Sequence, residues 1–210
     1  MRMKKFYNLL LFLCFISANT FSQTTDLLIS EYGEGSSGNS KYVEIYNGTG
    51  SSVNLSNYRI WTISNGGSWP EGTISLSGTL ADGSTYVIAN NSTDVPGADL
   101  YSGTCSWNGD DAVGLAKDIA SVWTLIDVVG TDGADPGTGW AVAGTTNGTV
   151  DKRLTRKATV CSPTTDWTTS AGTDATSSQW VITTPYSTGA ANAEHTSSCS
   201  GIVSEIQLQQ

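Results

Sequence analysis

Short segments in which apolar and polar residues alternate constrain this chain more than any other feature. Between them lie clusters rich in Gly, Asn, Ser and Asp, at residues 33–40, 47–52, 64–68 and 131–139. No segment keeps the 3.6-residue period of an amphipathic helix. We therefore predict an all-β protein with strands at residues 27–32, 42–46, 58–63, 73–76, 85–89, 112–116, 122–129, 153–156 and 180–182. Many short strands separated by turns are typical of an antiparallel β-sandwich or a small barrel.

The composition agrees with a single folded β domain. The chain has 210 residues, of which only 14% are charged, and this low fraction argues against a coiled coil. Seven Trp, eight Tyr and four Phe argue against disorder over the whole length. No repeat of fixed period is present, which argues against a propeller or a solenoid.

Residues 1–22 have the pattern of a secretory signal peptide. Arg2, Lys4 and Lys5 precede an apolar run at 6–16, and small residues then lead to a cleavage site after Ser22. The apolar run is about half of the roughly 20 residues that a membrane span needs. We expect a secreted protein, extracellular or at the cell surface, with no membrane span in its mature form.

Removal of this segment leaves seven basic against nineteen acidic residues, a net charge of −12. Affinity for nucleic acid rests on Lys and Arg that displace counterions, so general nucleic-acid binding is not expected. A protein or glycan surface remains open as a partner.

Three cysteines remain in the mature chain, and an oxidising compartment favours one disulfide and one spare thiol. We predict a Cys161–Cys199 disulfide, because these residues flank the last expected strand, and leave Cys105 unassigned. A zinc site is disfavoured, since there is no CxxC motif and His195 is the only histidine.

Two acidic turns are the only candidates for a metal site. Asp110 and Asp111 precede the strand at 112–116, and Asp132 and Asp135 lie in a Gly-rich loop. Oxygen ligands on loops suit a structural Ca²⁺, but the spacing is not that of an EF-hand. Turn formation is the favoured interpretation, because Asp stabilises turns by bonding its own backbone.

Four of the seven mature basic residues lie in one short segment, at Lys152, Arg153, Arg156 and Lys157. The period of a strand places Lys152 and Arg156 on one face and Arg153 and Lys157 on the other. These residues are candidates for binding an anionic glycan or a protein partner, although charge pairing and protection of an edge strand are favoured.

Exposed tryptophans are candidates for stacking on sugars, whereas buried ones fill a core. Trp69 in a turn and Trp140 after a Gly-rich loop are the candidates for exposure, and Trp123 and Trp180 are expected in the core.

No catalytic set emerges from the sequence, and we expect the chain not to be an enzyme. Residues 33–38 match GxGxxG, but a strand rather than a helix is expected next, which favours a hairpin loop. Glu31 and Glu44 are expected to have a structural role, either facing water or pairing with Lys41 or Arg59.

Several segments in order also carry a family resemblance. They are LISEY at 28–32 with EGSSGNS, KYVEIYN at 41–47, VNLSNY at 53–58, YVIA at 86–89, NGDDAV at 108–113, IDVVG at 126–130, DPG at 135–137 with Trp140, and LTRK at 154–157. As a set they resemble the lamin tail domain, in its secreted bacterial form, over residues 26–195. The resemblance implies an immunoglobulin-like β-sandwich. Asn47-Gly48-Thr49 stands where family members often have Asn-Pro-Thr, which changes one turn.

The resemblance also implies a role, because such bacterial domains often accompany secreted nucleases, phosphatases or adhesins as non-catalytic modules. It transfers no catalytic or ligand-binding residue. We expect a signal peptide at 1–22, a sandwich at 26–195 and a tail or linker at 196–210. The expected function is a secreted binding or adhesion module. The alternatives are an accessory domain of a secreted hydrolase, of nuclease or phosphatase type, whose catalytic part lies outside this chain, and a Ca²⁺-dependent hydrolase.

Overall fold

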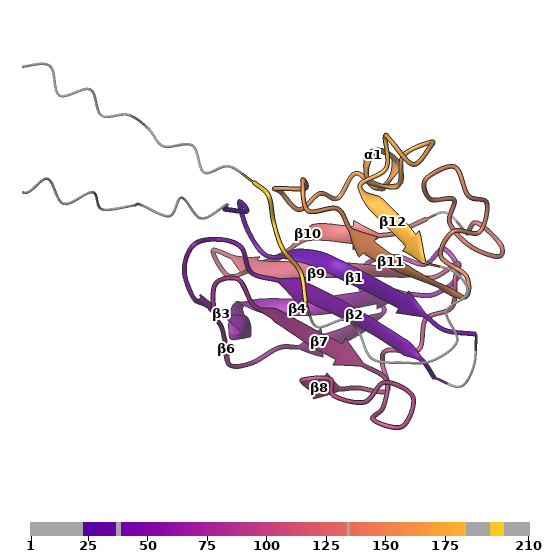
Figure 1. Cartoon of the computed structure of the whole chain (residues 1–210). Helices are drawn as coiled ribbons and strands as arrows, with labels where there is room; N and C mark the ends of the chain where they lie inside the picture. Colours follow the sequence, from indigo (N-terminus) through magenta and orange to yellow (C-terminus); the bar gives the residue numbers. More distant parts are fainter. Residues whose placement is uncertain (1–22, 37–38, 134, 184–193, 200–210) are drawn as a thin grey trace, which may run out of the picture.

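Two β-sheets pack against each other in the computed structural model, which describes residues 23–36, 39–133, 135–183 and 194–199 (Figure 1). The larger sheet has the order β12 (Trp180–Thr183), β11 (Lys152–Arg156), β1 (Leu28–Glu34), β2 (Lys41–Tyr46), β7 (Thr85–Ala89) and β8 (Leu100–Tyr101). The smaller has the order β10 (Val122–Val129), β9 (Ala112–Ile119), β4 (Tyr58–Ile63) and β5 (Gly72–Ser75). All pairs are antiparallel except β7–β8.

The remaining elements are short. β3 (Val53–Asn54) pairs with β6 (Thr79–Leu80), and the 3₁₀ turn η1 (Leu55–Asn57) connects β3 to β4. The helix α1 (Trp167–Ala171) lies between β11 and β12, and no described helix is long and apolar enough to cross a membrane. The prediction of an all-β sandwich is confirmed, and all nine expected strands are present. The three missed strands have two residues each, too few to show a period.

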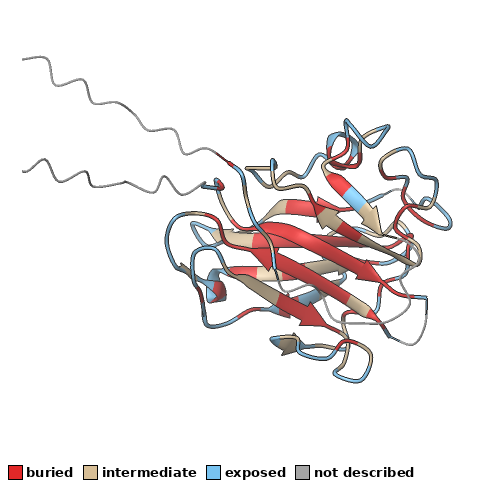
Figure 2. Ribbon diagram, viewed as in Figure 1, coloured by how far each residue is buried: buried red, intermediate tan, exposed pale blue. Residues whose placement is uncertain are grey.

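The core lies between the two sheets, and Figure 2 shows that β1 and β2 are buried along almost their whole length. Ile29, Val43 and Ile45 come from the larger sheet, and Ile60 and Leu115 from the smaller; all are fully buried. The 33–40 segment connects β1 to its antiparallel partner β2, so the hairpin interpretation of the GxGxxG match is confirmed.

The outward side of the larger sheet carries two buried carboxylates with structural partners. Glu31 accepts hydrogen bonds from the Tyr42 hydroxyl (2.9 Å) and the Thr155 hydroxyl (3.0 Å). Glu44 accepts one from Ser30 (2.7 Å). Lys41 and Arg59, the cations expected to pair with these carboxylates, have other partners.

Those two cations make other contacts. Lys41 forms an ion pair with Glu34, next to it in the β1–β2 pair. The Arg59 guanidinium lies over the Trp123 ring, 3.8 Å from its centroid.

A buried ion pair joins the two sheets at Asp127 and Arg156, whose side chains are both fully buried. A register shift between Leu125 and Asp127 accompanies the placement of Asp127 opposite the core residue Leu115. Besides the Arg156 guanidinium, the Asp127 carboxylate accepts hydrogen bonds from three backbone N–H groups: Ile29 (2.8 Å), Val128 (3.1 Å) and Thr164 (3.1 Å).

Arg156 uses its other N–H groups within the same region. It donates to the Ile29 carbonyl (3.0 Å), Ser170 Oγ (3.2 Å) and Gln179 Oε1 (2.7 Å). Its guanidinium also lies 4.0 Å from the centroid of the Trp180 ring. One side chain thus connects β1, β11, β12 and α1.

The predicted disulfide is present and fastens residues 194–199 to the larger sheet. Cys161 and Cys199 are bonded, with their Cα atoms 5.4 Å apart. Ser198 N–H donates to the Ala158 carbonyl (2.8 Å), and the His195 ring meets Tyr46 edge-on at 4.7 Å. In Figure 1 this short segment crosses the sheet in yellow.

Among the described cysteines Cys105 is the free thiol, and it lies in the core. Burial raises the pKa of its thiol to about 12, so the reactive thiolate is scarce at neutral pH. The predicted signal peptide (1–22) and most of the predicted tail (200–210) lie outside the described residues.

Replacement of Asp127 by Ala is expected to destabilise the fold by about 3–5 kcal/mol, because it leaves a buried guanidinium without its counter-ion. Urea denaturation of both proteins measures the difference. Asp132→Ala removes an exposed carboxylate and is the control, with an expected change within about 0.5 kcal/mol. Equal losses in the two variants would contradict the role of the ion pair.

Cys161→Ala removes a cross-link over a sequence separation of 38 residues. Loop closure of this length contributes about 4 kcal/mol, so the melting temperature under oxidising conditions should fall. A reducing agent should lower the melting temperature of the wild type but not that of the variant. An unchanged melting point in Cys161→Ala would argue against this contribution.

Candidate functional site

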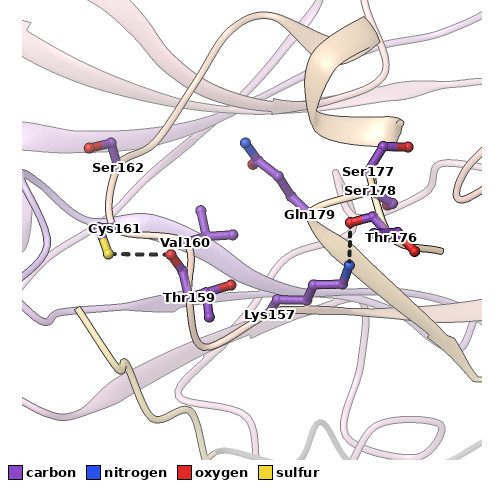
Figure 3. A pocket seen from close by; sticks show the side chains of 9 residues that line it. All are labelled: Lys157, Thr159, Val160, Cys161, Ser162, Thr176, Ser177, Ser178 and Gln179. Carbon is purple, nitrogen blue, oxygen red and sulfur yellow. Dashed lines mark hydrogen bonds between the residues drawn. The ribbon is translucent and has the colours of Figure 1, made fainter. Parts of the chain in front are cut away.

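An open pocket of about 450 Å³ lies beside the disulfide, between the loop that follows β11 and the loop that precedes β12 (Figure 3). Its walls carry hydroxyl groups, one amide and one ammonium, from Lys157, Thr159, Val160, Cys161, Ser162, Thr176, Ser177, Ser178 and Gln179. Figure 3 shows Lys157 and Gln179 extending between the two walls. No carboxylate is among these lining residues.

Backbone hydrogen bonds hold both walls in place. Lys157 N–H donates to the Gln179 carbonyl (2.9 Å), which continues the β11–β12 pairing, and Val160 N–H closes a turn onto the Lys157 carbonyl (3.0 Å). On the opposite wall the Asp174 carboxylate accepts from the N–H groups of Thr176 and Ser177, both at 2.8 Å. These bonds, the Ser177 hydroxyl and the Lys157 charge lower the pKa of Asp174.

The Lys157 ammonium connects the two walls. Its Nζ donates to the carbonyls of Ala175 (2.6 Å) and Thr176 (3.3 Å). An ammonium has three N–H bonds, so one remains for a ligand. With hydroxyls and an amide around it, the pocket suits a neutral or anionic group that both donates and accepts hydrogen bonds.

A second cavity, of about 520 Å³, contains His195. Its lining also includes Glu194, Asp99 and Ser84, residue types that could form a hydrolytic site. Asp99 instead accepts from Val87 N–H (2.8 Å), and the buried Nε2 of His195 has no hydrogen-bond partner among the residues that the structure describes. Burial, with a smaller effect of the Arg156 charge, lowers the pKa of His195 to about 4. The imidazole is therefore a weak base at neutral pH.

The basic segment at 152–157 does not form one exposed strip. Arg156 is 2% exposed and is held in the core by Asp127, so it does not belong to an exposed basic surface. Lys152 and Arg153 lie half-buried on β11. Lys157 alone of the four lines the pocket.

The four aspartates predicted as Ca²⁺ ligands divide into two buried and two exposed residues. Asp110 and Asp111 are 8% and 6% exposed, and Asp111 accepts from the N–H groups of Asn65 (3.0 Å) and Asn108 (2.9 Å). Burial is the main cause that raises the pKa of Asp111. Asp132 and Asp135 are exposed, and Asp135 accepts from Gly137 N–H (2.7 Å) within its own turn. In the described part of the chain, no three His, Cys, Asp or Glu side chains are grouped as metal ligands.

The tryptophans follow the predictions only in part. Trp180 is buried as expected, but Trp140 is also buried, with its Nε1 donating to the Asp111 carbonyl (3.0 Å). Trp69 is half-exposed, and so is Trp123, which was expected in the core. Trp61, also half-exposed, was missed, although its alternation with the buried Ile60 was a usable signal.

The His195 environment predicts a specific pH dependence. Its folded pKa lies below the unfolded value of about 6.5, so the unfolded chain binds more protons between pH 6.5 and 4. The stability that depends on a neutral imidazole is therefore complete above pH 6.5 and is lost as the pH falls toward 4. Because carboxylates also titrate in this range, the effect of His195 is measured by comparing the melting temperatures of two proteins. The melting temperature of His195→Gln should fall less than that of the wild type between pH 7 and pH 4.5. Identical pH profiles would contradict it.

Comparison with known proteins places the chain in a family. The model of the Lamin Tail Domain family matches residues 20–133. No curated protein and no solved structure matches significantly. The match covers more than half of the chain, and the family's immunoglobulin-like β-sandwich is the fold described above. The chain belongs to the lamin tail domain family.

Proposed function

We propose that this chain is a non-catalytic binding module that acts outside the cell and holds a ligand in the pocket around Lys157. The observation that carries the proposal is the lining of that pocket, a single ammonium among hydroxyls and an amide on fixed walls. Such a set of donors and acceptors recognises a hydroxyl- or carboxylate-bearing group, as glycans present. Loops on a rigid sandwich are the usual place for recognition.

Other features of the chain support an extracellular role. The Cys161–Cys199 disulfide is of a kind that persists in oxidising compartments, and the N-terminal sequence is typical of a signal peptide. The bond lies at the rim of the pocket and limits the movement of its Cys161 wall.

The described titratable groups support binding rather than catalysis. Asp127 and Arg156 form a structural ion pair, and Nε2 of His195 has no hydrogen-bond partner among the described residues. The pocket around Lys157 contains hydroxyls but no general base.

A glycan array probed with residues 23–210 tests the proposal. We expect binding to hydroxyl-rich or uronic-acid-containing glycans, weakened at least about ten-fold in Lys157→Met, because the charged donor is lost. Ser162→Tyr, at an exposed position of the wall, should block the pocket. Lys152→Met removes a lysine from the same segment outside the pocket and should bind as the wild type does.

Two results would contradict the proposal. One is equal binding by the wild type and the two pocket variants. The other is turnover: release of product from nucleic acid, phosphoester or glycan substrates by the wild type would make the chain an enzyme.

A further inference from the structure

The outer face of the four-stranded sheet carries a group of aromatic and polar side chains that the proposed function does not use. Residues directly opposite in an antiparallel pair share a face, as do alternate residues of one strand. Trp61 lies opposite Gly114, and Trp123 lies opposite Asp118. The intervening residue Leu115 points into the core, so these four residues point outward.

Small residues in the central strand β9 make room for this group. A Cβ at Gly114 would lie 2.4 Å from Cδ1 of Leu125 and 3.3 Å from Cη2 of Trp69, so both side chains lie directly over the glycine. Trp69, from the loop that follows β4, therefore lies across β9 on the face that Trp61 shares. Ala116, two residues further along β9, is the next small residue on the same face of the strand.

The indoles of Trp61, Trp69 and Trp123 are thus partly exposed on one face, and Trp69 also packs against the core. Arg59, which lies opposite Ala116, places its guanidinium over Trp123 at 3.8 Å. We call this surface the tryptophan face; its residues are Arg59, Trp61, Trp69, Asp118 and Trp123.

Polar atoms of the tryptophan face lack hydrogen-bond partners. Nε of Arg59, Nε1 of Trp61 and Oδ1 of Asp118 are all covered by neighbouring atoms and unbonded. Most buried polar atoms in proteins have a partner, and a group left without one costs stability. Two donors and one acceptor without partners, gathered among three indoles, indicate a surface whose partner comes from another molecule.

The side chains of the tryptophan face indicate which class of ligand it binds. Indole faces stack on flat apolar surfaces, while the two donors and the carboxylate need groups that accept and donate hydrogen bonds. A sugar ring offers both, with C–H groups on its faces and hydroxyls around its edge. A nucleic acid is disfavoured by the mature net charge of −12.

We propose that the tryptophan face binds a polysaccharide chain, with sugar rings stacked on Trp61 and Trp69 and hydroxyls bonded to Arg59, Trp61 and Asp118. Because the unbonded atoms are covered, a rotamer change of Arg59 away from Trp123 accompanies binding, a common adjustment at interfaces. The site lies on the smaller sheet, whereas Lys157 follows β11 of the larger sheet, so this proposal does not rest on the proposed function.

Titration of residues 23–210 with hexasaccharides tests the proposal. The probes are β-1,4-linked glucose, mannose and N-acetylglucosamine, followed by tryptophan fluorescence and calorimetry. We expect saturable binding of at least one probe, and an association constant at least about ten-fold lower in Trp61→Ala. Tyr101→Ala removes an aromatic that is 40% exposed on β8 of the other sheet and should leave binding unchanged.

A second variant and a second measurement keep the proposal testable if Trp61→Ala does not fold. Asp118→Asn should weaken binding several-fold without loss of the fold, and the bound sugar should shield wild-type tryptophans from acrylamide quenching. The proposal is overturned if no probe binds saturably, or if both variants bind as the wild type does. A loss confined to Lys157→Met would also overturn it, because binding would then belong to the pocket.

Discussion

The Asp127–Arg156 ion pair is the interaction on which the arrangement of this molecule depends. Removing two charges from water is expensive, and the cost is offset only when every remaining donor and acceptor is used. Here three backbone N–H groups donate to the carboxylate, and a carbonyl, a hydroxyl and an amide oxygen accept hydrogen bonds from the guanidinium. The amide belongs to Gln179, a lining residue of the candidate pocket, and Lys157 follows Arg156 directly. The pair therefore joins the sheets and also positions one wall of the pocket.

The two proposed binding surfaces arise from the same strand alternation that builds the core. On β9, Val113 and Leu115 fill the interior, while Gly114 and Ala116 on the other side leave space for Trp69 and for side chains of β4 and β10. On the larger sheet the outward side carries buried Glu31 and Glu44, with residues 194–199 fastened beside them by the disulfide. One sheet face is thus covered, and the other presents half-exposed aromatic groups.

The features that could be predicted from the sequence are those that depend on residues close together in the chain. Alternation and turn composition located nine strands, and the positions of Cys161 and Cys199 around the last strand gave the disulfide. The sequence-based predictions failed where a contact between residues far apart in the chain determines whether a side chain is buried. Trp140 is buried by a bond to the backbone of Asp111, and Arg156 by Asp127, each 29 residues away in the chain. The register shift before Asp127 changes which face its strand presents, so a regular alternation cannot anticipate it.

The candidate pocket was anticipated only through Lys157, because its other wall comes from a segment without a repeating pattern.

Two-dimensional NMR of the indole N–H groups during titration with an oligosaccharide tests directly whether the tryptophan face holds a sugar chain and leaves it intact. Seven tryptophans give seven separate reporters. We expect the signals of Trp61, Trp69 and Trp123 to shift and those of the four buried tryptophans, Trp107, Trp140, Trp167 and Trp180, to stay in place. The sugar resonances should remain those of the intact oligosaccharide for days. Uniform or absent shifts, or the appearance of cleaved sugar, would contradict it.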